Sequence, residues 1–204
     1  MAHSSDAGLM RRAIALAIRS GEEGEYPYGV VIARGGEVVA ESINRVARER
    51  DVTRHAEVVA IIAAQKALDS VSLDDCTIYV SAEPCAYCAY AIRESRIGRV
   101  VYGLTSPHMG GVSKWPVLTD RGISDAMPEV FAPPPAVLAG FMAQEAEDAL
   151  LKASPVVGRA VKARGLFVAP QAEVRATGST PRATLRERVM RVLRRTVFDR
   201  FGRS

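Results

Sequence analysis

The pattern of hydrophobic and polar residues predicts alternating helices and strands along the chain. In four segments apolar residues recur every three or four positions, as on one face of a helix, and short runs rich in valine and isoleucine between them are typical of strands. The predicted helices span residues 6–20, 55–68, 84–95 and 136–153, and the predicted strands span residues 29–34, 37–43, 76–81 and 99–104. This order favours an α/β fold, in which a mixed sheet carries helices on both faces and its later strands are parallel through right-handed crossovers.

Several ends of these elements carry local signals. One of residues 4–6 can cap the first helix, and Thr53 can cap the second. Gly35-Gly36, between the first two strands, is typical of a β-hairpin with a two-residue turn, because glycine accepts the positive φ angles of such turns. Pro84 suits the first position of the third helix. The second and third helices are therefore expected to begin at His55 and Pro84.

The remaining segments predict a long loop and a separate C-terminal part. Residues 105–135 are rich in glycine and proline, and loops of this length in compact domains tend to be functional. The predicted division is one domain over residues 1–153 and a basic extension over residues 154–204, with a helix at residues 181–201. The arginines of the extension would suit an acidic partner such as nucleic acid, or belong to a solvated tail.

Composition adds expectations about size and compartment. The chain has 204 residues, of which 48% are hydrophobic, enough for one domain with a buried core. Its three cysteines are an odd number and no secretory signal precedes the first helix, which favours a reducing compartment and a cytoplasmic location. No apolar run approaches the roughly 20 residues that span a bilayer, so no membrane association is expected. The net charge of +4 is modest.

Candidate chemistry gathers in two short segments. Cys85 and Cys88, one helical turn apart, can bind a metal together with the distant His55, and a zinc ion with three protein ligands keeps a fourth position for water. Glu57, two residues after His55, can carry the proton of that water. Both segments begin helices, whose positive ends favour thiolates and other anions. H-x-E followed by P-C-x-x-C is the signature of zinc-dependent nucleobase deaminases.

Each half of this signature has a simpler interpretation when taken alone. A single C-x-x-C often belongs to a structural zinc site or a redox pair, and a single H-x-E carries little information. A structural zinc site normally has a fourth protein ligand, and the remaining cysteine, Cys76, lies at the start of a strand and is interpreted as a small buried residue. The combination therefore favours a catalytic zinc.

With these residues the chain resembles the cytidine and deoxycytidylate deaminase superfamily, in the branch with guanine deaminases and bacterial tRNA adenosine deaminases. The resemblance covers roughly residues 9–151 and rests on Pro27-Tyr28-Gly29-Val30-Val31, Asn44, residues 51–57, Leu73-Asp74-Asp75-Cys76, residues 81–88 and residues 95–101. It implies a three-layer α/β/α fold with a mixed sheet of about five strands, and a homodimer. It further implies zinc bound by His55, Cys85 and Cys88, with Glu57 as proton shuttle.

The same resemblance implies substrate contacts. It assigns Asn44 to a hydrogen bond with the base, and backbone amides near Ala56 and Cys85 to the positioning of substrate and water. Tyr28, His108 and Trp115 are candidate walls of the pocket, although each could equally belong to the core.

The substrate stays open between three hypotheses. Leu73-Asp74-Asp75-Cys76 is similar to guanine deaminases, residues 95–101 are similar to the tRNA enzymes, and residues 105–116 are longer than the loop that the tRNA enzymes carry there. The first hypothesis is a hydrolytic deaminase of a free nucleobase or nucleoside. The alternative is a tRNA-specific adenosine deaminase whose arginine-rich extension neutralises phosphates. The third is a non-catalytic, zinc-stabilised nucleic-acid-binding module, against which Glu57 weighs because a structural site does not need it.

Overall fold

The computed structural model describes residues 2–175 of the chain. The helices of this part are α1 (Ala2–Glu22), α2 (Val46–Glu49), α3 (Ala56–Ala67), α4 (Ala86–Glu94), α5 (Arg121–Ala126), α6 (Ala143–Ala153) and α7 (Pro155–Ala163). The strands are β1 (Gly29–Arg34), β2 (Glu37–Ile43), β3 (Cys76–Ala82), β4 (Arg99–Leu104), β5 (Ala136–Ala139) and β6 (Glu173–Arg175). The helix predicted at residues 181–201 lies outside the described residues. None of the helices within the described range combines the length and apolar character needed to cross a bilayer.

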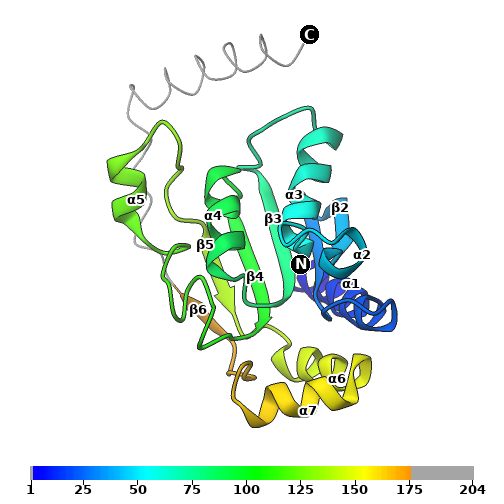
Figure 1. The fold of residues 1–204 in the computed structure, drawn as a ribbon. Coiled ribbons are helices and arrows are strands. Elements are labelled where there is room, and N and C mark those ends of the chain that lie inside the picture. Colours follow the sequence, from blue (N-terminus) through cyan, green and yellow to red (C-terminus); the bar gives the residue numbers. More distant parts are fainter. Residues whose placement is uncertain (1, 176–204) are drawn as a thin grey trace.

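The strands form one mixed sheet in the order β2-β1-β3-β4-β5-β6 (Figure 1). β1 pairs antiparallel with β2 and β3, β3, β4 and β5 are mutually parallel, and β6 returns antiparallel to β5. The predicted mixed sheet with later parallel strands is confirmed. The sheet has six strands where about five were expected, because the short β6 adds a strand at its edge.

Helices cover both faces of the sheet, which confirms the three-layer α/β/α fold. Alternate residues of β1 belong to different cores, because successive side chains of a strand point to opposite faces. Val30 and Ile32 pack with α3 and α4, whereas Val31 and Ala33 pack with α1 and α6. At Gly29 a Cβ atom would lie 2.1 Å from the carbonyl oxygen of Ala13, so this glycine lets α1 rest directly on the sheet.

The hairpin is as predicted, but three helix starts differ. Gly35 and Gly36 join β1 to β2 with φ angles of 59° and 89°. α1 begins before residues 4–6, so none of these caps it. The cap of α3 is His55 and not Thr53, and Pro84 precedes the cap of α4 and does not occupy its first position.

The segment predicted as one helix over residues 136–153 contains a strand and a helix. Residues 136–139 form β5, which pairs with β4 in the parallel register Arg99↔Ala136. Gly140 and Met142 then adopt positive φ angles of 70° and 55°, which separate the strand from α6. Four apolar residues are too few for their spacing to distinguish a strand from a helix. α7 and β6 occur within the segment predicted as an extension, and the division at residue 153 stays a prediction.

The long loop between β4 and β5 contains the short helix α5 and is fastened by a buried arginine. Arg93 of α4 is 1% exposed. Its guanidinium donates to the carbonyl oxygens of Val117, Asp120 and Ala132 at 2.6, 2.9 and 3.2 Å, and to the hydroxyl of Ser124. The loop thus supplies acceptors to both terminal nitrogens of this buried charge, while its Nε has no hydrogen-bond partner among the described residues.

An ion pair connects α1 to the sheet. The carboxylate of Asp6 accepts two hydrogen bonds of 2.8 Å from the guanidinium of Arg99 on β4, and one of 2.6 Å from the hydroxyl of Tyr79 on β3. Burial raises the pKa of Tyr79 above its ordinary range, and the hydrogen bond to the Asp6 carboxylate raises it further. The first helix is thus held by charge as well as by its apolar face.

We expect Asp6→Ala to lower the free energy of unfolding by about 2 kcal/mol, because it leaves Arg99 and Tyr79 without their acceptor while Arg99 stays partly solvated. Urea denaturation would measure the loss. Glu145→Ala is the matched control, since Glu145 pairs with Arg11 at 3.5 Å between exposed side chains and should cost less than about 0.5 kcal/mol. Equal losses in the two variants would contradict a special role for Asp6.

Candidate metal centre

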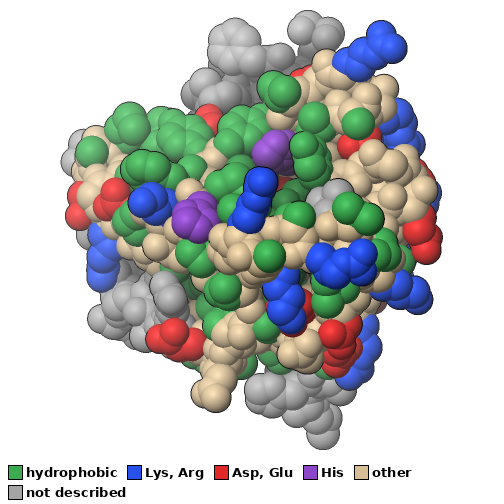
Figure 2. Space-filling view, turned by 60° about the horizontal axis from the view of Figure 1, so that its bottom comes forward, with side chains coloured by type: hydrophobic (Ala, Val, Ile, Leu, Met, Phe, Trp, Pro, Cys, Tyr) green, Lys and Arg blue, Asp and Glu red, His purple; other side chains and the backbone are tan. Residues whose placement is uncertain are grey.

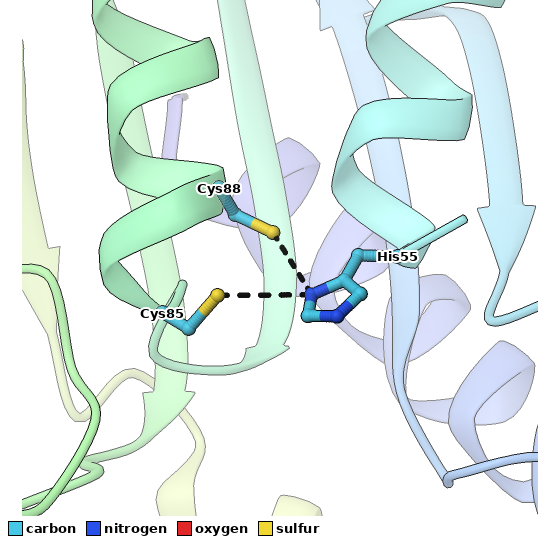
Figure 3. A group of neighbouring side chains, drawn as sticks. All are labelled: His55, Cys85 and Cys88. Atoms are coloured by element: carbon cyan, nitrogen blue, oxygen red, sulfur yellow. Dashed lines mark hydrogen bonds between the residues drawn. The ribbon is translucent and has the colours of Figure 1, made fainter. Parts of the chain in front are cut away.

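The side chains of the two signature segments stand at the starts of two helices. His55 is the N-cap of α3 and Cys85 is the N-cap of α4, both with extended backbone angles. Cys88 lies in the first turn of α4, on the side that faces His55 (Figure 3). Backbone amides at a helix start leave a partial positive charge, so the two helices present their positive ends to one site.

The distances between these three side chains fit a zinc ion. His55 Nδ1 lies 3.3 Å from Cys88 Sγ and 3.7 Å from Cys85 Sγ, and the three donor atoms all lie within 4.8 Å of one another. Tetrahedral zinc with ordinary Zn–N and Zn–S bonds separates such donors by about 3.6 Å. One imidazole and two thiolates are also a donor set that zinc prefers, and three protein ligands leave one position open. Cys76 is buried at the start of β3 and is not part of this group.

One of the two thiols carries a negative charge. A hydrogen bond from Cys88, followed by one from His55, lowers the pKa of Cys85 to about 4. The same hydrogen bond raises the pKa of Cys88 well above its ordinary value. Cys85 is therefore a thiolate at neutral pH, and the pair is ready to bind a cation.

The structure brings Glu57 to the same place. Glu57 is the second residue of α3 and is 6% exposed. Burial raises the pKa of its carboxyl group to about 7, and the charge of Cys85 adds to the effect. A carboxyl group with a pKa near neutral can both accept and release a proton, which is what general acid–base catalysis requires.

Asn44, Ala56 and Tyr28 lie around this group on neighbouring segments. Asn44 is 1% exposed and directly follows β2, and a 3.0 Å hydrogen bond from Arg45 N to Arg54 O holds its segment beside the start of α3. Ala56 is the first residue of α3 and is buried. Tyr28 precedes β1; burial raises the pKa of its hydroxyl above the ordinary range, with Glu57 as a further cause.

His108 and Trp115 belong to the loop that lies on the cysteine turn. Ala86 N donates to Met109 O at 3.1 Å and Gly111 N donates to Pro84 O at 2.8 Å, so this loop runs alongside residues 84–86. His108 is exposed. Trp115 is 54% exposed with Lys114 Nζ 5.6 Å from its ring centre, which excludes Trp115 from the core. Figure 2 shows the molecule with the bottom of Figure 1 brought forward. On this face, histidine, hydrophobic and basic side chains lie together.

Glu83 fastens that loop, a role that the sequence analysis did not find. Its carboxylate is 4% exposed and accepts hydrogen bonds from Ser106 N at 2.7 Å, Val112 N at 2.9 Å, and both the amide and hydroxyl of Ser113 at 2.7 Å. The signal that could have revealed it is an acidic residue at the end of an apolar strand, where only a fully bonded carboxylate is tolerated.

Tyr87 is a second residue that the sequence analysis missed. Its ring is 46% exposed and meets the His55 ring edge-on, with 5.6 Å between ring centres. An exposed aromatic residue inside P-C-x-x-C was the available signal.

Comparison with known proteins identifies the family. Residues 3–104 match the cytidine and deoxycytidylate deaminase zinc-binding region, which is half of the chain. The chain belongs to this family. Zinc is the metal of this family region, and the group of His55, Cys85 and Cys88 could hold it. The resemblance stated from the motifs is confirmed.

Relatives within the deaminase family refine the comparison. The chain is 41% identical over 104 residues to the tRNA-specific adenosine deaminase of Agrobacterium fabrum, covering 51% of this chain and 68% of that protein. A solved structure from work on A-to-I editing by tRNA:A34 deaminases is 34% identical, with a TM-score of 0.60, and the match covers 70% of this chain and 99% of the other. The guanine deaminase of Nitrosomonas europaea is 20% identical with a TM-score of 0.57, covering 71% and 82%, and shows the fold alone.

Some relatives are much longer than the matched region. The chain is 36% identical over 129 residues to the chloroplastic tRNA(adenine(34)) deaminase of Arabidopsis thaliana. This match covers 63% of the present chain but only 10% of the Arabidopsis protein.

We expect Cys88→Ala to lower the bound zinc from about one ion per chain by more than tenfold, because two ligands hold zinc far less tightly than three. Elemental analysis of the purified protein would measure it. Cys76→Ala is the matched control: it removes a buried thiol outside the group and should leave the zinc content unchanged. Wild-type zinc content in Cys88→Ala would rule out the assigned centre.

Proposed function

We propose that this protein is a zinc-dependent hydrolytic deaminase that converts an adenosine of tRNA to inosine. The proposed chemistry rests on the buried Glu57, which lies next to His55, Cys85 and Cys88. These three residues are typical zinc ligands and would leave the fourth coordination position of the ion open. The substrate is proposed from the relatives, since the Agrobacterium fabrum protein and the solved tRNA:A34 deaminase match over most of their own lengths. These matches favour the alternative hypothesis over a free nucleobase or nucleoside.

The residues have distinct roles in the proposed reaction. His55, Cys85 and Cys88 would hold zinc, which when bound supplies the positive charge that activates a water. Glu57 accepts a proton from the attacking water and passes it to a ring nitrogen. It then takes the second proton from the new hydroxyl on C6 and delivers it to the departing amine. A bond from C6 of adenosine to oxygen forms and the bond from C6 to nitrogen breaks, so adenosine and water give inosine and ammonia.

The surroundings of the centre suit a base that enters from outside. Asn44 would hydrogen-bond the base, the amide of Ala56 would help to position it, and Tyr28 would form a wall of the pocket. Because Glu57 is buried, the base must leave its stack to reach it, as in other enzymes that modify a base.

The rim of the centre carries groups of the kinds that can bind single-stranded RNA. Tyr87 and Trp115 expose aromatic rings, and Lys114 adds a positive charge beside Trp115. Aromatic rings stack on unpaired bases, and basic side chains neutralise phosphates.

A non-catalytic zinc module is disfavoured, because burying the Glu57 carboxyl group is costly and such a module gains nothing from it. We also propose that the protein forms a homodimer, which light scattering would test.

We expect Glu57→Gln to reduce ammonia release by at least about a thousandfold while zinc binding is retained, because the amide keeps the shape of the carboxyl group and cannot carry a proton. Single-turnover assays and elemental analysis would measure the two properties. Glu94→Gln, on the exposed end of α4, is the control and should keep full activity. An active Glu57→Gln variant would exclude the proposed chemistry.

We expect ammonia release from an anticodon stem-loop RNA with adenosine at the wobble position, and none from a panel of free bases and nucleosides. Because phosphate contacts release counterions, raising the salt from about 50 to about 200 mM should weaken RNA binding about tenfold or more. Activity confined to a free base or nucleoside, without salt dependence, would instead support the first hypothesis of the sequence analysis.

A further inference from the structure

We propose that Glu25 is a positioning residue for the substrate, because it fixes the side-chain amide of Asn44 in one orientation. Glu25 lies in the segment between α1 and β1 and is 6% exposed. Its carboxylate accepts a hydrogen bond from Asn44 Nδ2 at 3.1 Å, between two buried side chains. The inference rests on the proposed function, in which Asn44 contacts the base.

A carboxylate can set the direction of an amide because it only accepts hydrogen bonds. With Glu25 ionised, the nitrogen of the Asn44 amide must face Glu25, and its Oδ1 and second N–H hydrogen are left to face elsewhere. A neutral partner with both a donor and an acceptor would allow the amide to turn over. The charge of Glu25 thus determines which groups Asn44 offers to a base.

Backbone donors keep Glu25 ionised and in place. Oε2 also accepts from Ala47 N at 3.0 Å, and Oε1 accepts from Arg48 N at 2.7 Å. Burial acts to raise the pKa of Glu25, but the hydrogen bonds from Arg48, Ala47 and Asn44 together lower it below its ordinary value. The carboxylate therefore stays charged although little of it meets solvent.

Asn44 is well placed for a directed contact. It follows Ile43, which pairs with Gly29 at the start of β1, directly after Tyr28. On its other side, the hydrogen bond from Arg45 N to Arg54 O joins its segment to the residue before His55. The backbone at Asn44 therefore lies between Tyr28, a proposed pocket wall, and the start of the helix that carries Glu57.

Glu25 also holds the first amides of α2, so the experiment must separate that structural role from positioning. A double-mutant cycle does so: kcat/KM for the anticodon stem-loop RNA is measured for Glu25→Gln, Asn44→Ala and the double variant. We expect each single variant to lose about tenfold to a hundredfold, and the double variant to be no worse than Asn44→Ala alone. Losses that multiply in the double variant, or a Glu25→Gln variant within twofold of wild type, would overturn the proposal.

Glu23→Gln is the matched control for the cycle. Glu23 lies two residues away and binds the side chains of Arg19 and Arg48 at the surface, so its amide variant should keep the wild-type kcat/KM. Elemental analysis and thermal unfolding of Glu25→Gln would show whether zinc content and folding are retained.

A measurement on the unaltered protein covers the case in which Glu25→Gln fails to fold. In nitrogen-15 NMR spectra, the side-chain amide of Asn44, assigned from its loss in Asn44→Asp, should exchange with solvent much more slowly than that of the exposed Gln171. Equally fast exchange would show that Glu25 does not hold Asn44. If wild type released no ammonia from any substrate, the proposed function would fail, while the exchange rate would still decide the contact.

Discussion

The convergence of two helix starts at one place is the constraint on which the rest of the site depends. Because His55 and Cys85 are caps and not interior residues, the segments that lead into α3 and α4 set the positions of their side chains. The positive ends of both helices then act on the same few atoms, which favours the Cys85 thiolate and any anion bound nearby. The sheet holds the two helix starts at fixed positions relative to each other. On its opposite face, the ion pair between Asp6 and Arg99 fastens α1 to the sheet.

Three buried glutamates surround this convergence, and their hydrogen-bond partners separate their roles. Glu25 and Glu83 accept several hydrogen bonds each, mostly from backbone amides, and therefore work as fixed anchors. Glu57 lacks comparable compensation, so burial raises its pKa to about 7, whereas the pKa of Glu25 lies below its ordinary value. Similar burial thus yields an anchor where backbone donors are present, and a carboxyl group able to exchange a proton near neutral pH where they are few.

The sequence was sufficient for features that depend on residue type and spacing. The Gly35-Gly36 turn, the bounds of β4 and the grouping of His55, Cys85 and Cys88 all follow from local chemistry. β5 could not be recognised, since its four residues form a strand through their pairing with β4 and β6, which are distant in the sequence. The roles of Glu25 and Glu83 were missed because their partners are backbone amides 22 to 30 residues away, which every residue type carries and no motif marks.

The anchoring of the loop between β4 and β5 bears on how a substrate is selected. Glu83 holds its first part from the strand before the cysteine turn, and Arg93 holds its later part from α4. Both anchors are buried charged groups, and releasing either would leave an unpaired charge in the interior, which is costly. In the proposed reaction the loop would therefore act as a preformed wall of the pocket and not as a lid. Under the proposed function, such a wall would admit a base extruded from a flexible RNA loop, and the exposed rings of Tyr87 and Trp115 would be available to stack on its neighbours.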